Sequence, residues 1–248
     1  MFQIRRRFKE NEKLVYYQDI LANFNYKSPV IIRAPNFVYS GAYSPLQIDI
    51  KKNIVVPNEI SKHLELVEQN RESNFPKEIV ENIIRNKYKV PRISTFKISG
   101  VKIKERVALE IDLIKRGVVK VYNKDYLLYK LCRSDNFTKK DLLKNGRPNH
   151  ETVLPYILKN DGKSFAIEIP IWKRFSDSFL TGYIDLLRKN EDNKIQICDY
   201  KPKSFFHSIP QVCVYSIVLK EMTNIENSTC VMFNEDGAWE FKPEQKFL

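Results

Sequence analysis

Apolar residues in the second half of the chain group and alternate in the way that β-strands require. Three apolar runs of strand length span residues 164–171, 178–189 and 193–202. The polar segment 191–193 is short enough to join the last two runs as an antiparallel hairpin. A second hairpin is predicted within 229–243, about Asp236 and Gly237, a pair that favours tight turns.

Apolar residues at helical spacing predict six helices. These helices fall in residues 57–72, 75–89, 103–117, 124–134, 149–160 and 209–222. Four branched residues form a stripe along the third helix: Ile103, Val107, Ile111 and Ile114. Gly117 follows this stripe and is predicted to end the helix.

The order of these elements predicts the fold class. From residue 149 onward, a helix, three strands, a helix and two strands predict an α/β fold around a mixed central sheet. Upstream, residues 28–50 have the composition of short strands and turns. The helices of residues 103–145 form either a small winged-helix module or an elaboration packed on the core. Thr138 and Asp141 in this segment have the spacing of a capping box.

The positive charge of the chain is concentrated in its first part. Residues 1–149 contain 30 Lys and Arg against 16 Asp and Glu, whereas residues 150–248 contain 12 against 14. This asymmetry predicts a polyanionic partner, most often nucleic acid, although a generally basic surface is the alternative. We therefore divide the chain into a basic region, 1–146, that grips nucleic acid, and a core domain, 147–248.

Other features of the composition bear on location. No apolar run approaches ~18 residues, so no membrane span or membrane partner is expected. The basic amino terminus lacks the apolar region of a signal peptide, which predicts an intracellular location in the cytoplasm, nucleoid or organelle matrix. The four cysteines lack CxxC and zinc spacing, and we expect buried free thiols: Cys132, Cys198, Cys213 and Cys230.

Charged residues interrupt the apolar strands at positions that can meet. Asp185 lies inside the run "GYIDLL", and Asp199 and Lys201 lie two apart in "ICDYK", so these two face one side of their strand while Cys198 faces the other. The predicted hairpin brings Asp185 next to Asp199. Two adjacent carboxylates repel unless a cation neutralises them, and oxygen ligands suit Mg²⁺ or Mn²⁺. A buried salt-bridge cluster is the alternative.

The following helix carries two further polar residues on one face. Gln211 and Tyr215 are spaced i, i+4 among Val and Ile residues. They are candidates for positioning a phosphate group or Lys201, although either residue alone could be an ordinary helix edge. Lys201 itself could hold or deprotonate an attacking water and stabilise charge on phosphorus.

The segments "GYID", "DYK" and "QVCVY", in this order and spacing, resemble the motifs of the PD-(D/E)XK nuclease superfamily, in its RecB-type exonuclease branch. The resemblance covers about residues 147–222, a third of the chain. That branch also has an upstream histidine, and His150 in "RPNHETVL" stands 35 residues before Asp185. Glu168 lies in the strand before the first motif.

The resemblance implies a restriction-endonuclease-like core and assigns a role to each matching residue. His150, Asp185, Asp199 and the Tyr200 backbone carbonyl would bind Mg²⁺ or Mn²⁺, and Glu168 would bind a second metal or a metal-bound water. Lys201 would activate water and stabilise the transition state, with Gln211 and Tyr215 orienting Lys201 or the phosphate. Some relatives hold an iron–sulfur cluster on four cysteines, but only Cys230 follows the last motif here, so no cluster is expected.

The expected function is therefore a divalent-metal-dependent DNA nuclease, acting as an exonuclease on single- or double-stranded DNA. A helicase or another repair or recombination protein is the protein partner that the resemblance suggests. A non-catalytic nucleic-acid-binding subunit and an RNA-cleaving or defence endonuclease are the alternatives. In the basic region, five aromatic residues could stack on unpaired bases or belong to the core: Phe37, Tyr39, Tyr88, Tyr122 and Tyr126.

Overall fold

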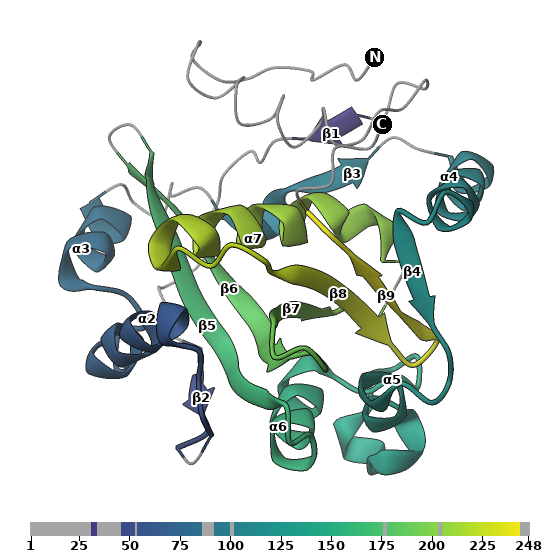
Figure 1. Ribbon diagram of the computed structural model, residues 1–248, viewed down its shortest axis with the longest axis horizontal. Coiled ribbons are helices and arrows are strands. Elements are labelled where there is room, and N and C mark those ends of the chain that lie inside the picture. Colours follow the sequence, from purple (N-terminus) through teal and green to yellow (C-terminus); the bar gives the residue numbers. More distant parts are fainter. Residues whose placement is uncertain are drawn as a thin grey trace.

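A seven-stranded sheet forms the centre of the molecule (Figure 1). The computed structural model describes residues 31–33, 46–52, 54–85, 92–99, 102–175, 178–202 and 205–243. The strands are β1 (Ile31–Arg33), β2 (Asp49–Ile50), β3 (Lys97–Ser99), β4 (Val119–Tyr122), β5 (Ser164–Phe175), β6 (Ser178–Lys189), β7 (Ile195–Tyr200), β8 (Thr229–Asn234) and β9 (Gly237–Phe241). The large sheet has the order β2-β5-β6-β7-β8-β9-β4, and β1 pairs with β3.

The helices surround this sheet at the predicted places. They are α2 (Asn58–Gln69), α3 (Lys77–Arg85), α4 (Ile103–Lys115), α5 (Leu127–Leu131), α6 (His150–Asn160) and α7 (Ile209–Thr223). Short 3₁₀ turns cover Ile93–Thr95, Ser134–Asn136, Lys139–Asp141 and Phe206–Ser208. The predicted α/β fold around a mixed sheet is confirmed, because β7 and β8 run parallel and every other neighbouring pair of the large sheet is antiparallel.

Both predicted hairpins are present. The turn after β6 reverses the chain so that Leu186 pairs with Cys198 and Lys189 with Ile195. In the second hairpin Asn234 pairs with Gly237, so the loop consists of Glu235 and Asp236 and lies one residue earlier than the sequence predicted. Parallel strands need a crossover, and α7 supplies it between β7 and β8.

Alternating residues of the central strands face two different cores. On one side Ile197, Met232 and Cys230 pack with α2 and α7. On the other side Cys198 and Val231 pack with α5 and α6. Cys198 thus lies on the face opposite its neighbours in the strand, as predicted. All four cysteines are buried and free, which is also as predicted.

The chain before residue 147 contributes to the same sheet. β2 pairs with β5 at one edge, and β4 pairs with β9 at the other. Of the two arrangements considered for residues 103–145, the structure therefore has the elaboration packed on the core. The capping box of Thr138 and Asp141 is present, and Gly117, with φ of +69°, follows the end of α4.

The apolar stripe of α4 does not face the core. Leu109 and Leu113 are the buried residues of this helix, at 4% and 3% exposure. The four residues of the stripe, Ile103, Val107, Ile111 and Ile114, are 71%, 42%, 47% and 37% exposed. The helix was predicted correctly, but its most regular apolar face points outward. Among the described residues, no helix is long and apolar enough to cross a membrane.

Candidate active site

The predicted residues of α6, β5 and β6 meet at one place. His150 is the first residue of α6, where the Asn149 side chain caps the helix by accepting a hydrogen bond from the Thr152 N–H. The His150 Nε2 atom lies 2.9 Å from Asp185 Oδ2, and its Nδ1 atom lies 3.2 Å from Glu168 Oε1. A single imidazole ring therefore bridges two carboxylates from neighbouring strands.

Glu168 has an unusual backbone conformation inside β5. Its φ of +53° falls in the left-handed region, which non-glycine residues rarely occupy within a strand. The flanking pairs, Ile167 with Leu186 and Ile169 with Ile184, put Glu168 opposite Asp185. Strain of this kind costs about 1–3 kcal/mol and clusters at functional sites. Here it accompanies the approach of the Glu168 carboxylate to His150.

The β6–β7 hairpin brings the third carboxylate. Its last paired residues are Leu186 and Cys198, so the strands separate at Asp185 and Asp199. The Tyr200 N–H bridges the gap by donating a hydrogen bond to Asp185 Oδ2 at 2.9 Å. Since the N–H and C=O of an extended residue point to the same side of the strand, the Tyr200 carbonyl oxygen also faces β6. This direction agrees with the predicted ligand role of that oxygen.

Lys201 completes the group. Its Nζ atom lies 2.9 Å from Asp199 Oδ2 and forms an ion pair with it. Asp199 is fully buried, and its Oδ1 atom has no hydrogen-bond partner within the described parts of the chain. A buried carboxylate is costly in free energy unless a cation neutralises it, and here Lys201 supplies one cation.

The protonation of these groups follows from burial and mutual charge. The charge of Asp185 outweighs burial and raises the pKa of His150 to about 11. Burial raises the pKa of Asp199 to about 7, although Lys201 opposes this. Burial lowers the pKa of Lys201, but the charges of Asp199 and Asp185 more than offset it, so the net shift is upward and Lys201 is an ammonium ion. Lys201 is thus suited to stabilising negative charge.

Gln211 and Tyr215 cover this group from α7. Both are buried, and the Gln211 Nε2 atom donates a hydrogen bond to the Tyr215 hydroxyl oxygen at 2.8 Å. Burial, and then the charges of Asp199 and Asp185, raise the pKa of Tyr215 well above its usual range. Within the described residues Gln211 Oε1 is buried without a hydrogen-bond partner, so it can accept one from a ligand.

The donor atoms are of the kinds that a divalent cation binds. Glu168, Asp185 and Asp199 supply three carboxylates, against which charged His150 and Lys201 leave a net charge of −1, or −2 once His150 loses its proton. Carboxylate oxygens with one imidazole suit Mg²⁺ or Mn²⁺. In the described part of the chain, however, no three His, Cys, Asp or Glu side chains converge on one point. Both nitrogens of His150 face carboxylates, so His150 would have to turn or lose its proton to become a ligand.

Sequence reasoning missed two residues that hold the strand end after Lys201. Asn234 donates from Nδ2 to the Lys201 carbonyl oxygen at 2.8 Å, and Arg147 donates to the Pro202 carbonyl oxygen at 2.6 Å. Arg147 also forms ion pairs with Glu235 and Asp236. Neither residue interrupts an apolar pattern, so the sequence carried no signal for this role.

Two of the aromatic residues proposed for base stacking, Tyr122 and Tyr126, are not part of this group. Tyr122 and Tyr126 stack on each other at 4.0 Å between ring centroids, and Tyr122 donates to Glu240. They belong to a packed layer beneath the sheet. Phe37, Tyr39 and Tyr88 lie outside the described residues.

Comparison with known proteins adds no family. No protein-family model matches the sequence, and no curated protein matches it. The arrangement of side chains is therefore the basis on which function is argued.

Proposed function

We propose that the protein is a divalent-metal-dependent nuclease that hydrolyses phosphodiester bonds in DNA, acting as an exonuclease with a core of the PD-(D/E)XK type. One observation carries this proposal. Three carboxylates from β5, β6 and β7 gather beside the ammonium group of Lys201, and Oδ1 of the buried Asp199 among them has no hydrogen-bond partner within the described residues. The ion pair with Lys201 engages Oδ2 of Asp199, which leaves Oδ1 for a further cation.

The residues divide the work of hydrolysis as follows. A bound Mg²⁺ or Mn²⁺ would supply a water of lowered pKa and would neutralise the carboxylates. Asp185 and Asp199 would hold that cation, together with the Tyr200 carbonyl oxygen and a deprotonated His150. Glu168 would hold a second ion or orient a water.

Lys201 would act on the phosphate. Its ammonium group, at 22% side-chain exposure, can approach a ligand and stabilise the negative charge that develops on the phosphoryl oxygens. Gln211 would accept or donate a hydrogen bond at the phosphate or at a water, while Tyr215 fixes the orientation of its amide. The basic residues of 1–149 would contact the phosphate backbone.

The direct test is cleavage of labelled single-stranded DNA, duplex DNA and RNA with Mg²⁺, with Mn²⁺ and with EDTA. We expect metal-dependent cleavage of DNA that falls by at least ~10²-fold in Lys201→Ala and Asp199→Ala. Lys194→Ala is a matched control, because Lys194 lies in the exposed turn of the same hairpin.

The outcome separates the candidate functions. If wild-type protein leaves all three substrates intact with either metal, and wild type and Asp185→Ala bind DNA equally well, the protein is a binding subunit and the nuclease proposal is wrong. Cleavage of RNA in preference to DNA would instead support an RNA endonuclease that uses the same residues.

A further inference from the structure

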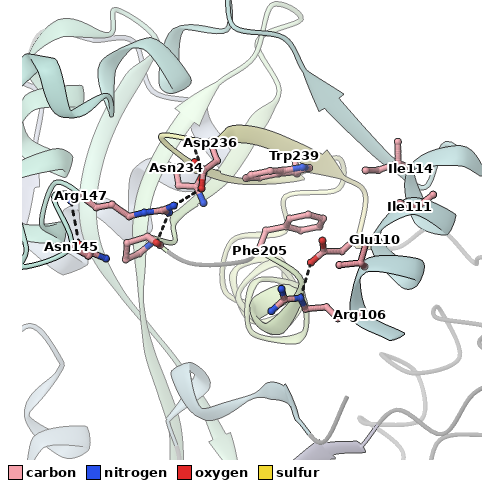
Figure 2. Close-up of a pocket in the computed structure, with 12 residues that line it drawn as sticks. Arg106, Glu110, Ile111, Ile114, Asn145, Arg147, Phe205, Asn234, Asp236 and Trp239 are labelled. Atoms are coloured by element: carbon pink, nitrogen blue, oxygen red, sulfur yellow. Dashed lines mark hydrogen bonds and ion pairs between the residues drawn. The ribbon is translucent and has the colours of Figure 1, made fainter. Parts of the chain in front are cut away.

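An open pocket lies between α4 and residues of β8 and β9 (Figure 2). Its volume is about 500 Å³, within the usual range for sites that bind small molecules. One wall is the outward face of α4, formed by Val107, Ile111 and Ile114. The opposite wall is Phe205 and Trp239, whose rings stack at 4.6 Å between centroids and 17° between planes. The exposed stripe of α4 thus faces aromatic rings across a gap.

The floor of this pocket is bonded directly to the strand that carries Lys201. Pro202 and Asn234 line the pocket, and Asn234 holds the Lys201 carbonyl oxygen at 2.8 Å. Arg147, also in the lining, holds the Pro202 carbonyl oxygen and stands three residues before His150. A ligand in the pocket would therefore contact the residues that hold the backbone at Lys201 and Pro202.

The chemistry of the walls suits a flat heterocycle with polar edges. Branched aliphatic and aromatic side chains pack against the faces of nucleobases with little dependence on sequence. At the end of the pocket away from α4, Asn145 and Asp236 provide an amide and a carboxylate group that can pair with base edges. At the α4 end, Arg106 Nε is buried and forms an ion pair with Glu110 Oε1 at 3.7 Å.

The surroundings of the pocket carry the positive charge that a nucleic acid strand requires. The 3₁₀ turn Lys139–Asp141 and the loop from it to Arg147 carry exposed Lys139, Lys140 and Lys144. Residues 102–116 of α4 and its ends contain five Lys and Arg against three Asp and Glu. An apolar pocket flanked by basic segments favours a strand with unpaired bases over an apolar peptide.

We propose that this pocket receives one unpaired base of a DNA strand whose adjacent phosphate lies at Lys201. The inference rests on the proposed nuclease function and specifies its substrate as single-stranded DNA or frayed duplex ends. A fully paired duplex cannot place a base between α4 and Trp239 without unpairing it, which weakens the binding of a blunt duplex. The enzyme would therefore bind and cleave single strands in preference to blunt duplexes.

The experiment compares two serine substitutions on α4. Ile111 lines the pocket, whereas Ile103 is on the same stripe but outside the lining, and both are exposed. Serine adds no charge, so a change in affinity does not report electrostatic repulsion. Binding of a fluorescein-labelled 12-nucleotide single strand and of the matching blunt duplex is measured by anisotropy, with Ca²⁺ in place of Mg²⁺.

We expect wild-type protein to bind the single strand more tightly than the duplex, and Ile111→Ser to weaken single-strand binding by about 5- to 10-fold. Duplex binding by Ile111→Ser, and binding of both probes by Ile103→Ser, should change by less than about 2-fold. Thermal unfolding checks that both variants fold, as expected for exposed positions. A single abasic site, placed in turn at each position of the strand, should at one position weaken binding to wild-type protein by the same factor. At that position the abasic site should not weaken binding to Ile111→Ser any further.

Three results would overturn the pocket assignment: equal losses on single strand and duplex, no loss in Ile111→Ser, or the same loss in Ile103→Ser. The third, combined with reduced self-association in light scattering, would identify the stripe as a contact between protein chains. Failure of the nuclease proposal is distinguishable. Selective single-strand binding without any cleavage would leave the base pocket standing, whereas cleavage without selectivity would refute only the pocket.

Discussion

The ring of Tyr215 lies directly over Gly182, so close that a β-carbon on Gly182 would stand 2.8 Å from Tyr215 Cε1. Ile93 closes the other side at 3.0 Å. The glycine of the "GYID" segment is therefore needed because α7 presses an aromatic ring onto β6 at that residue. This contact fixes the position of Tyr215 relative to the carboxylates. Through its hydrogen bond with Tyr215, Gln211 is fixed as well.

We accordingly expect Gly182→Ala to move Tyr215 and to cost about 1–3 kcal/mol in stability, because neither the ring nor Ile93 can yield easily. Nuclease activity per folded molecule should fall together with stability. In the double variant Gly182→Ala/Tyr215→Leu, stability should recover while activity does not. If Gly182→Ala unfolds at the wild-type temperature and retains full activity, the contact does not position Tyr215.

Replacement of Asp199 should separate stability from function. Asp199 is buried, its Oδ1 atom lacks a hydrogen bond in the described residues, and burial raises its pKa to about 7. A carboxyl whose folded-state pKa exceeds its unfolded value near 4 favours the fold at low pH and loses that contribution as pH rises through 7. Asp199→Asn should therefore raise the stability of metal-free protein at pH 8 by about 1–3 kcal/mol.

The same variant should lose its response to metal. Wild-type protein should gain thermal stability when Mn²⁺ is added, whereas Asp199→Asn should gain little. Melting curves in EDTA and in Mn²⁺ at pH 6 and pH 8 test both statements. Asp192→Asn, in the exposed turn of the same hairpin, should leave all four curves unchanged. Destabilisation by Asp199→Asn in EDTA would mean that the ion pair with Lys201 holds this part of the fold together.

The strands and their chemistry were predictable because their patterns are local. Asp185, Asp199 and Lys201 each interrupt an apolar run, and a short turn determines which of them can meet. The left-handed conformation of Glu168 was not predictable, because it depends on the approach of His150 from a helix on another part of the chain. The bridge that His150 forms between the carboxylates of Glu168 and Asp185 likewise appears only in three dimensions.

Long-range packing accounts for the other differences. β4 is four residues long and pairs with β9 more than a hundred positions away, so nothing near it in sequence signals a strand. α4 has apolar residues at helical spacing on two different faces. The face with fewer of them, formed by Leu109 and Leu113, proved to be the buried one. Periodicity identifies a helix but does not decide which of two apolar faces finds a partner.

His63 should make the fold sensitive to mild acid. It is buried on α2, with Nε2 placed 3.0 Å from the Pro170 carbonyl oxygen, and burial lowers its pKa to about 4. A histidine whose folded-state pKa lies below its unfolded value near 6.5 stabilises the fold above pH 6.5 and loses that contribution as pH falls towards 4. At pH 5.5 the loss should be about 1 kcal/mol.

The variant His63→Gln keeps a hydrogen-bond donor for Pro170 and has no charge to gain. Its free energy of unfolding should therefore fall less between pH 7 and pH 5.5 than that of wild-type protein, as measured by urea denaturation. Partly exposed His207 substituted by Gln is the control for general loss of a histidine. Parallel pH dependences for wild type and His63→Gln would show that other groups govern acid sensitivity.

A buried polar network at the opposite end of β7 should affect stability without affecting catalysis. Arg188 donates from Nε to Asp161 Oδ2 and from Nη1 to Gln196 Oε1, both at 2.6 Å. Gln196 in turn donates a hydrogen bond to Glu240. Arg188 and Asp161 have side chains 5% and 0% exposed, so each charge depends on the other. Removal of one partner from such a pair costs about 3–5 kcal/mol.

Arg188→Met should therefore lower the unfolding temperature strongly, while the protein that remains folded cleaves DNA at the wild-type rate. The control for surface ion pairs is Arg133→Met, because the Arg133–Asp135 pair is half exposed and such pairs contribute about 0–1 kcal/mol. Active-site titration would normalise the rates to folded protein. If Arg188→Met reduces the rate per folded molecule by 10-fold or more, the network influences the position of Lys201 through β7, and stability and catalysis are coupled along that strand.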